Sequence, residues 1–137
     1  MSVELNGSQL TIHDVETVSR GRSNVTVSKD AWQRIRECRS MIQRKIDAHE
    51  VMYGVTTGIG EFSEVVLSPD QVEEFQRYLI YSHAAGIGDA MVEEVVRGAM
   101  LGRINVHCHG NSGGRPEVTE HIVNMLNRGI TPIAAAK

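Results

Sequence analysis

The sequence predicts a mainly α-helical chain with two glycine-rich loops. Apolar residues recur at intervals of three and four through several segments, which is the period of a helix with one buried face. Serine and proline, which favour helix starts, precede some of these segments. Most of the glycines cluster between the segments and therefore mark loops.

The first part of the chain is expected to hold two helices and a short strand. Residues 10–19 carry apolar side chains three residues apart and end at a glycine, which predicts a short helix. Residues 24–27 alternate between polar and apolar side chains, as a strand does. Ser28 is a favourable N-cap, and the apolar face that follows it predicts a helix as far as about Ala48.

The segment 51–62 interrupts the helical period with three glycines and several β-branched residues, so no helix is expected there. Ser68, Pro69 and Gln71 then form a helix-start pattern, because serine and glutamine can build a capping box and proline suits the first turn. The expected apolar face of that helix consists of Val72, Phe75, Leu79, Ile80 and His83.

Two further helices are expected in the last third of the chain. Asp89 is interpreted as the N-cap of the first, and a second glycine-rich loop follows at residues 109–115. Pro116 opens the last helix, and residues 130–137 should be extended. The residues expected to face inward on the helix after Asp89 are Val92, Val95, Val96 and Ala99.

Length and composition exclude several classes of protein. The 137 residues suit one domain, and 14 basic against 17 acidic residues leave no basic excess for a general nucleic-acid binder. No apolar run approaches the roughly 18 residues of a membrane span. The first residues have no export pattern, and two cysteines are too few for a disulfide framework, so a cytoplasmic location is expected.

The run His107-Cys108-His109 suggests a metal site at first sight. Alternating residues share a face only in a strand, however, and no third or fourth ligand stands at zinc-like spacing. The sequence therefore favours a helix end that enters a loop, and no metal site is predicted.

The glycines at 54, 58 and 60 lack the Gly-Lys-Ser/Thr of a phosphate loop and the spacing of a dinucleotide loop. They indicate either a tight turn or a place where a ligand approaches the backbone closely. In the second case the phenol of Tyr53 would be a proton-transfer group. His83 also has two interpretations. It is either a histidine of the core or a polar group that orients a ligand at the edge of an apolar pocket.

Three motifs carry a resemblance to a known family: Tyr53-Gly-Val-Thr-Thr-Gly-Ile-Gly60, Ser82-His-Ala-Ala-Gly-Ile-Gly88 and Gly110-Asn-Ser-Gly-Gly-Arg115. Together they resemble the N-terminal part of the aromatic amino-acid ammonia-lyases and aminomutases. The resemblance covers nearly the whole chain. It implies that residues 1–137 are a single N-terminal helical segment of a large helical enzyme that forms a homotetramer.

The resemblance also implies roles for three residues. Tyr53 matches the tyrosine that removes a proton from the β-carbon of the substrate. Gly60 matches a glycine whose backbone lies against the substrate, and His83 matches a position that contacts the substrate side chain. The implied substrate is a small aromatic amino acid, with no nucleic acid or membrane as partner.

The family's electrophile is a methylidene-imidazolone ring, formed from an internal Ala-Ser-Gly. These 137 residues contain no Ala-Ser-Gly. Asn111-Ser112-Gly113 belongs to the separate loop motif and is not interpreted as the precursor. The chain by itself is therefore expected to be inactive and to need the remainder of the enzyme and other subunits.

The leading hypothesis is part of an ammonia-lyase or 2,3-aminomutase that acts on an aromatic L-amino acid, with tyrosine favoured. Thr56 resembles members directed at phenylalanine or tyrosine, and His83 could hydrogen-bond a phenol. Glu61 resembles the aminomutases, but lyase and mutase are not separated. The alternatives are a histidine ammonia-lyase and a non-catalytic helical interaction module that keeps the family fold.

Overall fold

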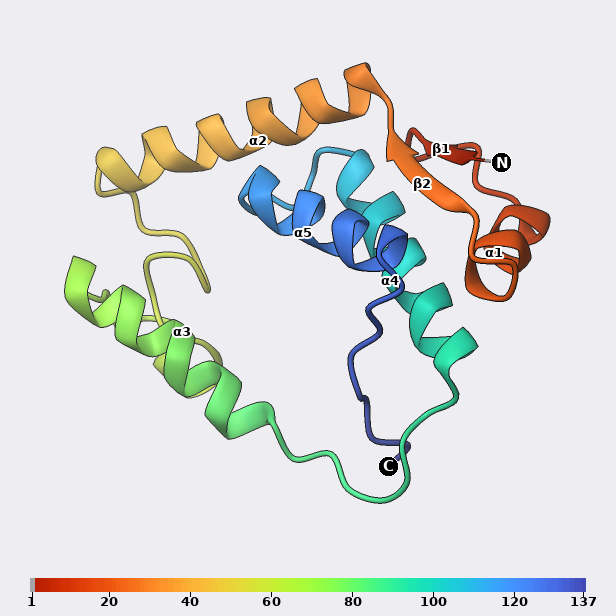
Figure 1. Cartoon of the computed structure of the whole chain (residues 1–137). Helices are drawn as coiled ribbons and strands as arrows, with labels where there is room; N and C mark the ends of the chain where they lie inside the picture. Colours follow the sequence, from red (N-terminus) through yellow and green to blue (C-terminus); the bar gives the residue numbers. More distant parts are fainter. Residues whose placement is uncertain (1) are drawn as a thin grey trace. The chain divides into compact units, whose positions relative to one another are not determined.

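The computed structural model describes residues 2–137 and confirms the prediction of a mainly helical chain (Figure 1). The chain divides into two compact units. The first unit comprises the described residues up to Ile42 together with Gly88–Lys137, and the second unit comprises Gln43–Ile87. In chain order the elements are β1 (Ser2–Leu5), α1 (Ile12–Ser19), β2 (Asn24–Val27), α2 (Lys29–Asp47), a 3-10 turn (Gly60–Phe62), α3 (Pro69–His83), α4 (Glu93–Cys108) and α5 (Pro116–Asn127).

The core of the first unit lies around α4, which packs against α1, α5 and β1 (Figure 1). β1 and β2 pair in parallel, with Ser2 opposite Asn24. The side chain of Asn127 fixes α5 to this sheet, because it accepts a hydrogen bond from the Val25 amide at 2.7 Å and donates one to the Val25 carbonyl at 2.9 Å. The buried residues that form this core cluster are Leu5, Val18, Val25, Ala31, Val96, Met100, Leu101, Ile104, Cys108 and Leu126.

A buried arginine on α4 joins two helix ends. Arg97 is 1% exposed and donates hydrogen bonds to the carbonyl oxygens of Val18, at 3.1 Å, and Leu126, at 3.3 Å. These carbonyls lie near the C-termini of α1 and α5, where a cation is favoured by the helix dipole. Burial lowers the pKa of the Arg97 guanidinium. Arg97 therefore satisfies a backbone carbonyl near the C-terminus of each of the two helices.

The prediction that Asp89 caps a helix is wrong. α4 begins only at Glu93, because Ala90 forms an antiparallel bridge with Ala135 in the C-terminal segment. The Met91 amide donates to the Ala134 carbonyl at 2.8 Å, and the Ala136 amide donates to the Asp89 carbonyl at 2.9 Å.

The inward face predicted for this helix is correct only in part. Val96 is buried, whereas Val92, Val95 and Ala99 are exposed. The helix starts three residues later than predicted, with Val92 as its N-cap, and its packed face passes through Arg97 and Leu101 and not through Val95 and Ala99.

The second unit contains the glycine loop and α3. The predicted capping box is present at the start of α3: the Ser68 hydroxyl accepts from the Gln71 amide, and the Gln71 side chain accepts from the Ser68 amide at 2.9 Å. Leu79 is partly buried on the predicted apolar face, but Ile80 is 68% exposed and His83 is exposed. This face is thus only partly covered within the chain. Of the helices in the described chain, none is long and apolar enough to cross a membrane.

Candidate active site

The glycine loop of the second unit is held by the hydroxyls of two threonines. The Met52 amide donates to the Thr56 Oγ1 at 2.8 Å, and that hydroxyl donates to the Glu50 carbonyl at 2.9 Å. The Gly54 amide donates to the Thr57 Oγ1 at 3.2 Å. Each hydroxyl satisfies backbone groups that no helix or sheet ladder would satisfy here.

Thr57 also anchors the loop to the segment that returns beside it. It is 1% exposed and forms an antiparallel bridge with Val66. On either side of this bridge, the Gly58 amide donates to the Val65 carbonyl at 3.2 Å and the Leu67 amide donates to the Thr56 carbonyl at 3.1 Å. The loop is therefore an ordered structure stabilised by its own hydrogen bonds.

The glycines of this loop are required by its backbone. Gly54 and Gly60 have φ values of +68° and +60°, which residues with a side chain rarely adopt. A Cβ at Gly58 would lie 2.6 Å from the Cβ of Phe62 and 2.8 Å from its carbonyl oxygen, so no side chain fits. The interpretation as a tight turn is correct, and it is compatible with a ligand site at the same place.

The turn brings together two of the three residues predicted to form the site. The Gly60 amide donates to the Tyr53 hydroxyl oxygen at an N–O distance of 3.4 Å. Tyr53 is 68% exposed, so its phenol is accessible. An N–H directed at a phenol oxygen stabilises negative charge on that oxygen. The arrangement suits a phenol that accepts a proton.

His83 is the last residue of α3 and its side chain is exposed. Its Nδ1 lies 2.9 Å from the Leu79 carbonyl oxygen and 3.0 Å from the Ser82 hydroxyl. Within the described residues it makes no hydrogen bond with Tyr53 or Gly60. All three predicted residues nevertheless belong to the second unit.

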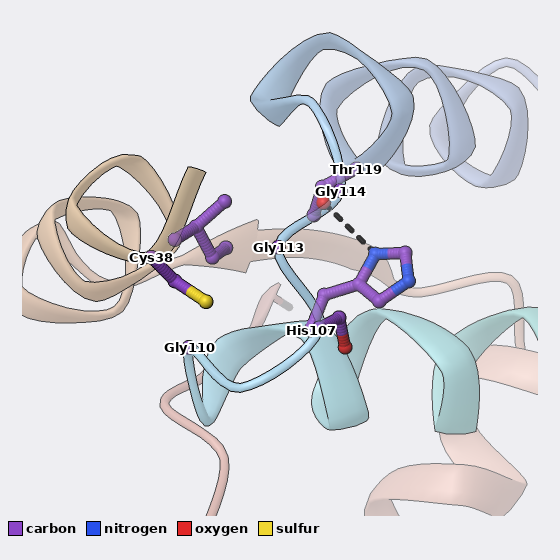
Figure 2. Close-up of a pocket in the computed structure, with 8 residues that line it drawn as sticks. Cys38, His107, Gly110, Gly113, Gly114 and Thr119 are labelled. Atoms are coloured by element: carbon purple, nitrogen blue, oxygen red, sulfur yellow. Dashed lines mark hydrogen bonds between the residues drawn. The ribbon is translucent and has the colours of Figure 1, made fainter. Parts of the chain in front are cut away.

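The second glycine-rich loop lines a small pocket in the first unit, drawn in Figure 2. His107 Nδ1 is 2.9 Å from the hydroxyl of the buried Thr119. A Cβ at Gly110 would lie 2.6 Å from the Cβ of Arg34, and one at Gly113 would lie 2.7 Å from Ile42 Cγ1, so the loop packs closely on α2. The pocket has room for about one water molecule and cannot hold an amino acid.

The His107-Cys108-His109 run has the predicted form of a helix end: α4 ends at Cys108 and His109 is its C-cap. Among residues 2–137 no group of three or more metal-ligating side chains is close enough to hold an ion. Burial raises the pKa of the Cys108 thiol to about 11 and lowers the pKa of His107. Both groups belong to the first unit.

Thr57 and Thr119 were not singled out from the sequence. Both residues are buried: the Thr57 hydroxyl accepts from the Gly54 amide in the glycine loop, and the Thr119 hydroxyl, in α5, lies 2.9 Å from His107 Nδ1. In the sequence, these residues are marked only by their position among the glycines or just after them. Threonines are too common at such positions for this to identify a residue that stabilises a loop.

Comparison with known proteins assigns the family. The model of the family described as aromatic amino acid lyase matches residues 10–137, nearly the whole chain. This chain belongs to the aromatic amino acid lyase family. The membership predicted from the three motifs is therefore confirmed.

Relatives of this lyase-family chain include both ammonia-lyases and aminomutases. A histidine ammonia-lyase of Alkaliphilus metalliredigens is 43% identical over 98% of this chain and 27% of its own length. The crystal structure of a tyrosine aminomutase from Streptomyces globisporus has a TM-score of 0.90 and 31% identity, over 96% of this chain and 25% of its own. A histidine ammonia-lyase structure from Trypanosoma cruzi has a TM-score of 0.84 and 30% identity, over 93% and 24%.

These similarities confirm the helical ammonia-lyase fold. The chain spans about a quarter of the length of these relatives. Their names include both histidine and tyrosine as amino acids on which family members act.

Proposed function

We propose that this chain supplies part of the active site of an ammonia-lyase or 2,3-aminomutase that acts on an aromatic L-amino acid, with tyrosine as the first candidate. The observation that supports it most is the contact between the Gly60 amide and the Tyr53 hydroxyl oxygen. A family chain with no catalytic role would not need an exposed phenol paired with a backbone N–H. The non-catalytic interaction module is therefore the weaker alternative.

Tyr53 is proposed to accept the proton from the β-carbon of the substrate. That proton is weakly acidic, so the acceptor oxygen must be accessible and its negative charge must be stabilised. Tyr53 is 68% exposed, which supports access to its oxygen, and the Gly60 amide that donates to this oxygen supports the stabilisation of negative charge. The threonine hydrogen bonds keep the phenol and the amide on one ordered turn.

The family's methylidene-imidazolone ring supplies an electrophile for the amino group of the substrate. This chain does not contain the Ala-Ser-Gly from which the ring forms. Asn111-Ser112-Gly113 is not a substitute, because Gly113 lies against Ile42 beside a pocket too small for an amino acid. No step through the ring is derived from this chain, and the complete enzyme, proposed to be a cytoplasmic homotetramer, must supply it.

His83 is proposed to determine which aromatic amino acid the enzyme prefers as substrate. Its imidazole stands at the end of α3 beyond the partly buried Leu79, so a ring that lies along this face would present its far edge to His83. The hydroxyl of a tyrosine substrate could hydrogen-bond the His83 imidazole, whereas a phenylalanine substrate would leave that imidazole without a hydrogen-bond partner. Sites of this kind discriminate strongly.

Histidine is the second candidate substrate, favoured by the 43% identity with a histidine ammonia-lyase over nearly the whole chain. An imidazole N–H of the substrate could occupy the place of the tyrosine hydroxyl. The two candidates share Tyr53, Gly60 and His83 and differ in the ring that must fit.

The test measures kcat/KM of a complete enzyme that contains this sequence with tyrosine, histidine and phenylalanine. Tyrosine is expected to give the highest value, and His83→Phe should move the preference towards phenylalanine. A preference for histidine would select the second candidate. Absence of turnover with all three, in a protein whose prosthetic ring is visible by ultraviolet absorbance, would favour the non-catalytic module.

A further inference from the structure

The ring of His83 is flanked on one side by two groups of its own helix. Nδ1 lies 2.9 Å from the carbonyl oxygen of Leu79 and 3.0 Å from the Ser82 hydroxyl oxygen. The Ser82 hydroxyl in turn lies 3.1 Å from the same carbonyl oxygen. These three short distances bear on which nitrogen of the neutral ring carries the proton.

A carbonyl oxygen can only accept a hydrogen bond. If Nδ1 had no proton, its lone pair would face the lone pairs of the Leu79 oxygen at 2.9 Å, which is unfavourable. With the proton on Nδ1, the ring donates to that oxygen. Such a bond to a backbone carbonyl commonly sets the tautomer of a histidine.

Ser82 reinforces the same tautomer. Its O–H donates to the Leu79 carbonyl at 3.1 Å, which leaves a lone pair of the hydroxyl oxygen turned towards the Nδ1 proton. The position at the end of α3 acts in the same direction, because the C-terminal turn of a helix carries partial negative charge and favours donors.

We propose that the Leu79 carbonyl and the Ser82 hydroxyl hold neutral His83 with its proton on Nδ1, so that Nε2 recognises a substrate ring bearing a hydrogen-bond donor at its far edge. Ser82 is then a positioning residue that acts through His83. The recognition step rests on the proposed function, whereas the tautomer does not.

Aromatic amino acids of nearly equal size should then differ as substrates according to whether the far edge of the ring carries a hydrogen-bond donor. Rings with a 4-hydroxyl or 4-amino group can donate to Nε2, and so can an imidazole N–H. A 4-fluoro ring offers no donor. It would leave the Nε2 lone pair without a partner once the site is closed from water.

The first experiment determines the tautomer in the 137-residue chain by long-range ¹H–¹⁵N correlation of the histidine rings. The His83 signals are identified by their loss in His83→Gln. At a pH where the ring is neutral, the pattern of a proton on Nδ1 is expected. A dominant proton on Nε2 would overturn the proposal.

The role of Ser82 is tested in the same spectra. Ser82→Ala should raise the share of the Nε2-protonated form by roughly two- to tenfold, the usual weight of one hydrogen bond. Ser82→Thr keeps the hydroxyl and should restore the wild-type pattern. Equal spectra for wild type and Ser82→Ala would show that Ser82 has no part in setting the tautomer.

The second experiment compares 4-aminophenylalanine with 4-fluorophenylalanine as substrates of a complete enzyme that contains this sequence. The amino compound should have a kcat/KM at least about tenfold higher, and Ser82→Ala should reduce that ratio by roughly two- to tenfold. Equal values for both compounds, with the Nδ1-protonated form seen by NMR, would contradict the proposed contact of His83 with substrate and leave the tautomer assignment standing.

Discussion

The two units of the chain differ in what holds them together. The first unit has a packed core around α4 and a buried arginine that joins two helix ends. In the second unit, Thr57 is the one described residue with a buried side chain, whereas Phe62, Ile80 and Tyr81 are each more than 60% exposed. Yet Tyr53, Gly60 and His83 all lie in the second unit. Stability and the candidate chemistry therefore come from different parts of the chain.

The second unit compensates for its small core with short-range hydrogen bonds. The threonines of the glycine loop and the capping box of α3 join residues that are near one another in sequence. Such bonds fix a local geometry, but each contributes only about 1 kcal/mol to stability. The comparison predicts that core substitutions matter most in the first unit and loop substitutions matter locally in the second.

The largest effect on stability is expected for Leu101→Ala. Leu101 is fully buried, so its truncation should lower the free energy of unfolding by about 2–5 kcal/mol. The matched change Ile80→Ala, at a side chain 68% exposed in the second unit, should change it by less than about 0.5 kcal/mol. Urea unfolding of the chain measures both. Similar losses for the two variants would mean that the second unit is packed as tightly as the first.

A smaller effect is expected for Gly58→Ala in the glycine loop. The added Cβ would meet Phe62 at 2.6 Å, which should cost about 1–3 kcal/mol as overpacking does elsewhere. The loss should appear as faster hydrogen exchange of the backbone amides at positions 58 and 67, with the first unit unchanged. Gly102→Ala is the control, because apart from the local backbone and neighbours of α4 no atom lies within 4 Å of its Cβ position. Helix propensity should make this variant more stable by up to about 1 kcal/mol.

The two cysteines provide a chemical test of the packed core. Cys108 is fully buried and burial raises its pKa to about 11, whereas Cys38 is partly exposed. At pH 8, a thiol reagent should label Cys38 rapidly and Cys108 only when the chain unfolds. Cys38→Ser should remove the rapid phase. Rapid labelling of both thiols would contradict the core described for the first unit.

The smallest effect is expected from pH. Burial lowers the pKa of His107, so the unfolded chain binds a proton more readily than the folded chain as pH falls below about 6.5. The contribution of His107 to stability should therefore be complete above that pH, decline as pH falls from about 6.5 towards the lowered pKa, and level off below it. His107→Gln should flatten the decline between pH 7 and 5 in urea unfolding, whereas His121→Gln, at an exposed position, should not.

Local features of the fold were predictable from the sequence. The capping box of Ser68 and Gln71 depends on residues three apart, and the glycine loop at 51–62 is correctly predicted to be free of α-helix. The start of α4 was not predictable in this way. Asp89 has the character of an N-cap, but pairing with Ala136, far away in sequence, keeps its segment extended.

Features that depend on distant pairing were the ones the sequence did not reveal. β1 was not predicted, although its four residues alternate as those of β2 do, and its strand form depends on the parallel pairing with β2. Arg97 is buried because two helix ends converge on it, which charge patterning cannot predict. The roles predicted for Tyr53 and Gly60 came from the family resemblance, and the contact between the Gly60 amide and the Tyr53 hydroxyl oxygen was not predicted.

The central claim is that Tyr53 accepts the substrate proton. The most direct test is the turnover of Tyr53→Phe in a complete enzyme that contains this sequence, with the prosthetic ring followed by ultraviolet absorbance. The variant should keep the ring absorbance and the fold, since the phenol is exposed, and lose turnover by at least about 10²–10⁴-fold. Near-native turnover with unchanged ring absorbance would contradict the account and remove Tyr53 from the chemistry.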